Sequence, residues 1–299
     1  MDNKPVIGFI GIGVMGRSMA GHLLNAGYPL HVHNRTQAKA QDLLDKGAQW
    51  QDSPGKVAAV SDVIITIVGF PNDVEAVYLG DDGILTNARA GSTVIDMTTS
   101  CPDLAQKIAE QAKTKGISSF DAPVSGGVGG AAAGTLTFMC GGSEEAYSRA
   151  EVYLRVMGKN IFHAGDAGNG QVAKICNNML LGIHMIGTCE AFNLAEKLGL
   201  DAQKFYDISS TASGQNWSMT SYCPAPGPVE SAPSNKNYEP GFTAAMMLKD
   251  LRLAQDAATS ARASTPLGSQ SEAMYSLMES AKKDSLDFSG IMKLINGSL

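Results

Sequence analysis

Two hydrophobic patterns divide the chain. Up to about residue 164, short apolar runs alternate with longer stretches in which apolar residues recur every three to four positions. Short apolar runs are typical of buried parallel strands, and the longer periodicity is typical of helices that cover them. The predicted strands are Val6–Ile10, Leu30–His33, Val63–Val68, Thr93–Met97, Ile117–Phe120, Leu136–Cys140 and Asn160–His163. Residues 1–164 are therefore predicted to form a doubly wound α/β domain with a mostly parallel sheet.

Beyond residue 164 the strand pattern stops and helical periodicity takes over. A long, nearly uncharged apolar helix is predicted from about residue 170 to 198, and further helices at 201–211, 243–263, 266–282 and from Phe288 onward. The irregular segment 213–241 contains five of the chain's twelve prolines, and loops of this length are usually functional or pack on a neighbour. We expect an all-α domain at residues 165–299, joined to the first domain by the long helix and carrying substrate and oligomer contacts.

The composition argues against several classes of function. The 299 residues carry a net charge of −6 and contain no run of Lys or Arg, so we expect no nucleic-acid partner. The five cysteines form no CxxC pair and the five histidines form no HExxH-like cluster, so we expect free thiols in a reducing compartment and no metal. The first predicted strand leaves no room for a targeting segment, and no uncharged run spans a bilayer. We expect a cytoplasmic protein with no membrane partner.

A glycine-rich motif directly follows the first predicted strand. Its three glycines form a GxGxxG pattern between this strand and a helix that ends near Gly27. In this context the first glycine makes a tight turn, the second lets the backbone approach a pyrophosphate, and the third lets the helix pack on the strand. The free N–H groups and the dipole at the helix start suit phosphates. We predict a Rossmann-type domain whose cofactor contacts are Gly11, Ile12, Gly13, Val14, Met15 and Gly16.

The end of the second predicted strand bears on the choice of cofactor. NAD enzymes carry an acidic residue here, about 20 residues past the glycine turn, which binds the ribose hydroxyls. This chain has Asn34, Arg35 and Thr36 instead. Arg35 can pair with a 2′-phosphate, and the other two side chains can donate hydrogen bonds to it. We therefore predict that NADP is preferred, with NAD as the alternative. Thr36 can also serve as a helix cap.

Loops at the carboxyl ends of later strands supply further candidates. Val68 and Gly69 follow one predicted strand and Thr99 follows the next. Ligands bind at this edge of a doubly wound sheet, although position alone fits plain loop residues equally well. The turn Ser125–Gly127 offers a hydroxyl and consecutive backbone N–H groups, which can bind a carboxylate. A flexible turn before the next strand is the alternative for this segment.

The long apolar helix predicted after residue 170 carries a lysine and an amide on one face. Lys174 and Asn178 are four residues apart, which places them one helical turn from each other. One interpretation is a lysine whose stem packs on apolar surface while its amine reaches water. The other is a desolvated amine that exchanges protons near neutral pH. The helix alone does not decide between them.

Four motifs follow one another in an order that is typical of one enzyme family. They are Gly8-Phe9-Ile10-Gly11-x-Gly13-x-Met15-Gly16, Asp121-Ala122-Pro123-Val124-Ser125-Gly126-Gly127, Gly168-x-Gly170-x-x-x-Lys174-x-x-x-Asn178 and Lys249-Asp250-Leu251. Together they resemble the β-hydroxyacid dehydrogenase family over essentially the whole chain. Each motif alone is weak, and their combination makes the resemblance specific.

The resemblance implies a reversible, nicotinamide-dependent oxidation of a small β-hydroxyacid. The favoured substrate is 3-hydroxyisobutyrate, with methylmalonate semialdehyde as its product. Lys174 is implied as the general acid/base and Asn178 as the residue that positions the substrate. The implied carboxylate site is Ser125, Gly126 and Gly127, and the implied cofactor contacts include Val68, Gly69, Thr99 and Lys249. With these partners, the acid/base interpretation of the lysine is favoured over an amine that reaches water.

Several questions stay open at the level of sequence. Trp217 and Phe242 can form apolar walls for a branched substrate or can simply pack inside the protein. Related activities on tartronate semialdehyde, glyoxylate, succinic semialdehyde or serine are alternatives, and a nucleotide sensor without turnover is a more distant one. The long apolar helix and the proline-rich segment predict burial against another copy of the chain, in a homodimer or homotetramer.

Overall fold

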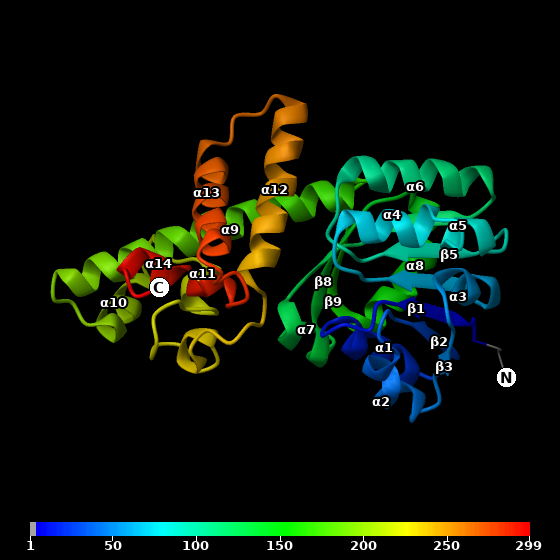
Figure 1. The fold of residues 1–299 in the computed structure, drawn as a ribbon, viewed down its shortest axis with the longest axis horizontal. Coiled ribbons are helices and arrows are strands. Elements are labelled where there is room, and N and C mark those ends of the chain that lie inside the picture. Colours follow the sequence, from blue (N-terminus) through cyan, green and yellow to red (C-terminus); the bar gives the residue numbers. More distant parts are fainter. Residues whose placement is uncertain (1–3) are drawn as a thin grey trace. The chain divides into compact units, whose positions relative to one another are not determined.

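The first unit of the protein is built on a six-stranded parallel sheet. The computed structural model describes residues 4–299, and its contacts divide the chain into a unit that extends to Lys174 and a unit that begins at Ile175. In the first unit the strand order is β3-β2-β1-β4-β5-β6, and every neighbouring pair is parallel (Figure 1). The strands are β1 (Ile7–Ile10), β2 (Leu30–His33), β3 (Gln49–Trp50), β4 (Val63–Thr66), β5 (Thr93–Asp96) and β6 (Ser118–Asp121).

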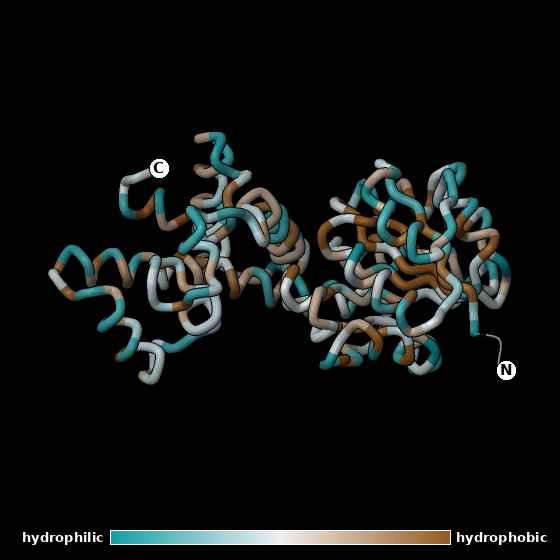
Figure 2. The backbone as a smooth tube through the Cα atoms, turned by 90° about the horizontal axis from the view of Figure 1, so that it is seen from below, coloured by the Kyte–Doolittle hydropathy of each residue, from teal (hydrophilic) through white to brown (hydrophobic). Residues whose placement is uncertain are grey.

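Two layers of helices cover the two faces of this sheet. Ile65 packs in one layer and its neighbour Ile64 in the other, and both are fully buried. Burial on both faces explains why the strands are continuous apolar runs, which Figure 2 shows as brown segments inside this unit. One layer contains α1 (Gly16–Asn25) and α8 (Glu144–Met157), and the other contains α3 (Pro54–Val60), α4 (Pro71–Leu79), α5 (Ile84–Asn87) and α6 (Pro102–Thr114). The predicted doubly wound architecture is confirmed.

A second, smaller sheet lies beyond β6 in the chain. Its strands are β7 (Val124–Ser125), β8 (Leu136–Cys140) and β9 (Gly158–His163), with β7 antiparallel and β9 parallel to β8. A bridge between Asp121 and Gly141 connects it to the end of β6. The sequence predicted β8 and β9 as strands but did not separate them from the main sheet. It also missed β3 and β7, because two-residue strands have no measurable period.

The second unit is helical. Its core contains methionines and aromatic rings such as Met247, Tyr275 and Phe288, all of which are buried. In Figure 1 α12 and α13 lie side by side, and the two helices are in contact. The helices are α9 (Asn169–Lys197), which begins in the first unit, α10 (Ala202–Ser209), α11 (Trp217–Thr220), α12 (Ala244–Ala261), α13 (Pro266–Ser280) and α14 (Ile291–Asn296). The predicted helical C-terminal region is confirmed, and the proline-rich segment contains α11 and a 3₁₀ turn, Pro233–Lys236.

Two negative findings concern the described part of the chain. Within residues 4–299, every helix is too short or too polar to cross a bilayer. The same residues contain no group of three or more His, Cys, Asp or Glu side chains placed to hold a metal ion.

Candidate functional site

The glycine turn after β1 has the geometry that the motif predicts. Gly11 has a φ of +102°, and a Cβ atom added to it would lie 2.0 Å from the carbonyl oxygen of Ile67. A Cβ atom on Gly16 would lie 1.9 Å from the carbonyl oxygen of Gly11. The position of a Cβ atom on Gly13, by contrast, has no atom within 4 Å. Gly11 and Gly16 therefore pack the turn closely against neighbouring backbone, whereas Gly13 faces open space where a phosphate can approach.

The start of α1 is suited to an anion. The first turn of the helix carries no acidic side chain, and its cap residue Met15 makes no side-chain hydrogen bond to the helix. Val14 is 73% exposed, whereas Ile12 is buried in the core. The backbone at Gly13 is thus held in place by the buried side chain of Ile12 before it and is followed by the solvent-exposed side chain of Val14. The positive end of the helix dipole adds to this preference for a phosphate.

The loop after β2 holds the three residues that were predicted to select the cofactor. Asn34 accepts a hydrogen bond from the backbone N–H of Ile12 (3.1 Å) and donates one to the carbonyl oxygen of Thr36 (2.9 Å). Its amide therefore fixes the glycine turn to this loop. The side chain of Arg35 is 85% exposed and forms a 3.4 Å ion pair with Asp73. Thr36 precedes a 3₁₀ turn, and its side chain makes no capping bond.

Short hydrogen bonds fix the loop after β4. The N–H of Val68 donates to Oγ1 of Thr98 (2.9 Å), which ties this loop to the one after β5. The N–H of Phe70 donates to the carboxylate of Asp73 (3.1 Å), and Gly69 leaves room for that carboxylate. The predicted residues Val68 and Gly69 thus lie on the loop just before α4, whose first turn carries Asp73, the partner of Arg35.

Asp96 is a buried carboxylate that belongs to none of the motifs recognised in the sequence. It accepts hydrogen bonds from Oγ1 of Thr66 (2.8 Å) and from the N–H of Thr98 (3.1 Å). Burial raises the pKa of Asp96 to about 6, against the opposing effect of these hydrogen bonds. The signal in the sequence was an acidic residue inside an otherwise apolar strand. Its partners indicate that it shapes the loop at the end of β5.

Asp121, at the end of β6, holds the start of α9. Its two carboxylate oxygens accept hydrogen bonds from the N–H groups of Gly168 (2.7 Å) and Gln171 (2.9 Å). Burial raises the pKa of Asp121 to about 6, against the opposing effect of these backbone hydrogen bonds. An ionised carboxylate at a helix N-terminus favours the helix through its dipole. This residue was part of a predicted motif, but no pattern in the sequence indicated its partners.

The turn Ser125–Gly127 leads into a short helix, α7 (Gly127–Ala133). Gly126 and Gly127 have φ values of +131° and +62°, which explains why glycine occupies both positions. A Cβ atom on Gly127 would have no neighbour within 4 Å, so this side of the turn is open. Ser125 is partly buried in β7. The arrangement is consistent with a carboxylate that approaches the turn from solvent.

Lys174 and Asn178 both lie on α9. Lys174 is 7% exposed and Asn178 is 2% exposed. A lysine buried to this degree differs from one whose amine is carried out to bulk water. Both side chains interact with other groups of the protein. Their spacing in a continuous helix places them one turn apart, as predicted.

A carboxylate on α12 connects the amide on α9 with a buried lysine. Asn178 donates a hydrogen bond to one oxygen of Asp250. The other oxygen of Asp250 forms a 3.1 Å ion pair with Nζ of Lys249, and both partners are almost completely buried. The sequence identified Asn178 and Lys249 separately and contained Asp250 only as part of a motif. The structure joins the three residues into one polar cluster of the second unit.

Trp217 and Phe242 belong to an aromatic cluster of the second unit. Trp217 stacks on Tyr222 with a centroid distance of 5.1 Å, and Phe242 packs edge-on against Phe288 at 5.7 Å. Trp217 is 47% exposed, so one face of its ring contacts solvent. Tyr222 also packs on Phe288, at 5.2 Å, which links the two pairs.

Asp287 holds this cluster together. It accepts hydrogen bonds from the hydroxyl of Tyr222 (2.8 Å) and from the N–H groups of Gly241 (2.9 Å) and Phe242 (3.1 Å). Its other oxygen binds the N–H and the hydroxyl of Ser289. No local pattern in the sequence indicates this role of Asp287. Its partners Tyr222, Gly241 and Phe242 are all more than 40 positions away along the chain.

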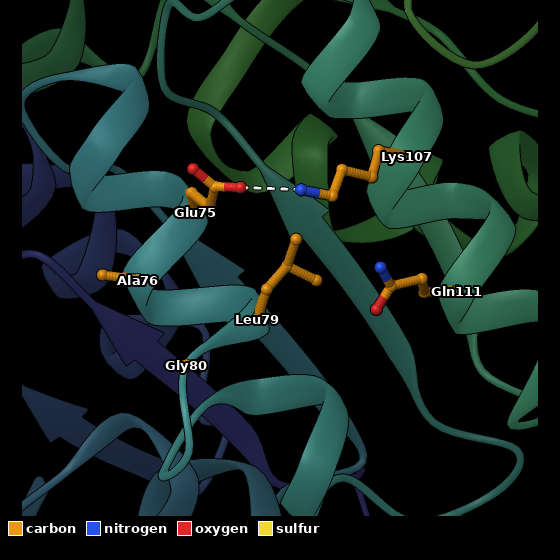
Figure 3. A pocket seen from close by; sticks show the side chains of 6 residues that line it. All are labelled: Glu75, Ala76, Leu79, Gly80, Lys107 and Gln111. Atoms are coloured by element: carbon orange, nitrogen blue, oxygen red, sulfur yellow. Dashed lines mark hydrogen bonds and ion pairs between the residues drawn. The ribbon is translucent and has the colours of Figure 1, made fainter.

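A surface hollow lies between α4 and α6, and Figure 3 shows an ion pair of Glu75 and Lys107 across it (2.7 Å). Leu79 and Gln111 also line this hollow. None of the residues predicted from the sequence to bind cofactor or substrate is among its lining residues. The hollow is therefore not part of the predicted cofactor or substrate site.

Two family models together cover nearly the whole chain. The NAD binding domain of 6-phosphogluconate dehydrogenase matches residues 6–165. The NAD-binding domain of NADP-dependent 3-hydroxyisobutyrate dehydrogenase matches residues 168–295. The match boundary coincides with the segment between β9 and α9.

Individual relatives match over almost their full length. A 3-hydroxyisobutyrate dehydrogenase of Pseudomonas aeruginosa is 46% identical, with 97% of this chain and 98% of the relative covered. An NAD-dependent L-serine dehydrogenase of the same organism is 44% identical, with 97% of each chain covered. The structure of Mycobacterium tuberculosis 3-hydroxyisobutyrate dehydrogenase with L-serine is 39% identical, covers 98% of this chain and 99% of its own, and has a TM-score of 0.91.

The fold agrees with these matches. The chain is an oxidoreductase with an NAD(P)-binding domain of the Rossmann type. We conclude that it belongs to the β-hydroxyacid dehydrogenase family.

Proposed function

We propose that this protein catalyses the reversible oxidation of 3-hydroxyisobutyrate to methylmalonate semialdehyde. The observation that carries the proposal is the buried Lys174 on a helix whose first turn is hydrogen-bonded to the ends of β5 and β6. The names of the relatives support the choice of substrate. Residues 1–164 are assigned to cofactor binding and to the substrate carboxylate, and residues 165–299 to further substrate contacts, one cofactor contact and the oligomer contacts.

The proposed chemistry divides the work between the protein and a bound nicotinamide. The nicotinamide supplies the hydride acceptor for oxidation and the hydride donor for reduction. Ser125, Gly126 and Gly127 bind the substrate carboxylate through N–H groups and a hydroxyl. Lys174 takes the hydroxyl proton during oxidation and returns it during reduction. Asn178 orients the hydroxyl, and its hydrogen bond to Asp250 fixes the amide for that task.

The open position beside Gly13 and the helix start at α1 fit the pyrophosphate of a dinucleotide. We assign the cofactor contacts to the glycine turn, Arg35 and the loop residues Val68, Gly69 and Thr99, with Lys249 as a further contact. We infer that NADP is preferred over NAD. Arg35 is exposed and weakly paired, so a 2′-phosphate can replace Asp73 as its partner.

Arg35→Ala is expected to lower kcat/KM for NADP about 10- to 100-fold and to change kcat/KM for NAD less than about 3-fold. A hydrogen-bonded charge pair contributes about 1.5–3 kcal/mol, and about 1.4 kcal/mol corresponds to tenfold. Steady-state kinetics with both cofactors measures the effect. Arg89→Ala is the control, since Arg89 forms a similar exposed pair with Asp62 in the same unit. An equal loss with both cofactors would contradict the assignment.

Oxidation of L-serine is the second candidate, because a 44% identical relative is named for that activity. Serine has an ammonium group where 3-hydroxyisobutyrate has a methyl group, and the aromatic cluster around Trp217 and Phe242 offers an apolar surface. Apolar surface favours the methyl group. We propose that this cluster forms part of the substrate wall.

A panel assay tests the proposed function. The absorbance of the reduced cofactor is followed with 3-hydroxyisobutyrate, L-serine, glycerate, tartronate semialdehyde, glyoxylate and succinic semialdehyde, each with NADP(H) and NAD(H). We expect the highest kcat/KM for 3-hydroxyisobutyrate with NADP. A higher value for another substrate would replace the assignment by that activity. Cofactor binding without turnover of any compound would indicate a nucleotide sensor.

We further propose that the protein is a cytoplasmic homodimer or homotetramer. The described cysteines are all free thiols, which fits a reducing compartment. Leu180, Leu194 and Leu198 on or just after α9 are between 50% and 78% exposed, which is unusual for large apolar side chains on one helix. Contact with a second copy of the chain would cover them.

A further inference from the structure

The side chain of Gln171 is completely buried and is hydrogen-bonded at both ends of its amide. Its oxygen accepts from the N–H of Ser100 (2.8 Å), and its nitrogen donates to the carbonyl oxygen of Thr98 (2.7 Å). Both partners lie on the loop after β5, and Thr99 lies between them. An amide that meets one donor and one acceptor of the same loop fixes both the distance and the orientation of that loop.

The backbone of the same helical turn is fixed from a second side. Asp121 accepts hydrogen bonds from the N–H groups of Gly168 and Gln171. A Cβ atom on Gly170 would lie 2.4 Å from the carbonyl oxygen of Met139, so the helix also lies against β8. The first turn of α9 therefore has little freedom to shift with respect to β5, β6 or β8.

We propose that Gln171 is a positioning residue that sets the acid/base Lys174 with respect to the cofactor loop around Thr99. This inference rests on the proposed function. Lys174 follows Gln171 by three residues, so the two side chains are neighbours on the helix surface. Proton transfer by the lysine and hydride transfer at the cofactor must occur at one substrate carbon, and an error of about 1 Å can cost about 100-fold in rate. The buried amide of Gln171 joins the helical turn that precedes Lys174 to the loop around Thr99.

A purely structural role predicts a different result. In that case the loss of Gln171 lowers the fraction of folded protein, and each folded molecule turns over at the normal rate. A positioning role predicts slower chemistry in fully folded molecules. The primary deuterium isotope effect on kcat distinguishes the two roles, because it increases only when hydride transfer becomes slower relative to product release.

The experiment compares Gln171→Met and Gln171→Glu with the wild-type enzyme. Methionine keeps the volume and removes both hydrogen bonds, whereas glutamate keeps the acceptor for Ser100 and places an oxygen opposite the carbonyl of Thr98. The control is Ser61→Ala, which removes a buried hydrogen bond to a backbone carbonyl elsewhere in the first unit (2.7 Å). Activity is expressed per folded molecule, counted by cofactor binding, with cofactor deuterated at the transferred position.

For Gln171→Met we expect kcat to fall about 10- to 100-fold, with the KM for the hydroxyacid changed less than about 3-fold and a larger isotope effect. For Gln171→Glu we expect a smaller fall in kcat and a smaller increase in the isotope effect. This variant is used for the test if the methionine variant does not fold. Ser61→Ala is expected to retain the wild-type kcat and isotope effect. A wild-type kcat per folded molecule, or an unchanged isotope effect, in the Gln171 variants would overturn the inference. Wild-type enzyme that turns over no β-hydroxyacid would instead refute the proposed function on which it rests.

Discussion

Lys174→Ala is expected to lower kcat at least about 100-fold in both directions of the reaction, the scale of a lost general acid/base. Lys174 is buried on α9, and in the proposed oxidation its amine accepts the hydroxyl proton of the substrate. Binding of the dinucleotide should change little, because we assign its phosphates to the glycine turn Gly11–Gly16 and give Lys174 no role in holding them. Steady-state kinetics and fluorescence titration with reduced cofactor measure the two quantities.

Two control variants show whether the loss of kcat comes from the missing proton transfer or only from the loss of a lysine or of a positive charge. Lys197→Ala removes an exposed lysine from the other end of the same helix and should leave kcat unchanged. Lys174→Arg keeps a positive charge but cannot release a proton near neutral pH, so it should be nearly as inactive as the alanine variant. Activity of Lys174→Arg close to that of the wild type would show that charge, and not proton transfer, is what the position supplies.

Gly16→Ala is expected to destabilise the first unit by at least about 2 kcal/mol and to weaken cofactor binding at least about tenfold. The added Cβ atom would lie 1.9 Å from the carbonyl oxygen of Gly11, so the backbone of the turn has to move. Thermal unfolding measures the first effect and cofactor titration the second. The shift in Tm should be several degrees, since 1 kcal/mol corresponds to about 2–4 °C in domains of 150–250 residues.

Gly13→Ala is the matched comparison. Its Cβ atom meets nothing within 4 Å, so the unfolding temperature should stay within about 1 °C of the wild type. The same atom occupies the space that we assign to the pyrophosphate, so the affinity for NADPH should still fall about tenfold. Tight NADPH binding by Gly13→Ala would show that the phosphates lie elsewhere. Equal unfolding temperatures of the two variants would contradict the close packing at Gly16.

The α/β half of the fold was predictable because its signals are local. A buried parallel strand is an apolar run whatever its neighbours are, and six of the seven predicted strands lie within one residue at their first position. The motif Gly11–Gly16 also has a local cause, namely a turn in which positions 11 and 16 have no room for a side chain. The separation of β8 and β9 into their own sheet has no such signal, because it depends on which strands pair and not on their composition.

In the candidate site, too, some residues have a local signal in the sequence and others depend on distant partners. Lys174 and Asn178 were predicted as a pair from helical spacing, and Gly126 and Gly127 from turn chemistry, while their roles came from the family resemblance. The roles of Asp121 and Gln171 depend on partners about 50 to 70 positions away, so no local pattern indicates them. Asn34 was predicted to donate to a phosphate, which stays a prediction, and in the structure its amide accepts from the N–H of Ile12 and donates to the carbonyl oxygen of Thr36.

The hydrogen bonds of Asp287 have a consequence for the synthesis of the chain. Tyr222, Gly241 and Phe242 leave the ribosome well before Asp287, which follows them by 45 to 65 positions along the chain. Domains fold in order as they are synthesised, so the first unit can form while the second is incomplete. The segment that contains Tyr222, Gly241 and Phe242, however, lacks its acceptor until Asp287 has been synthesised. A chain that is terminated shortly before Asp287 would therefore contain a folded nucleotide-binding unit, but Tyr222, Gly241 and Phe242 would lack the carboxylate to which they donate hydrogen bonds.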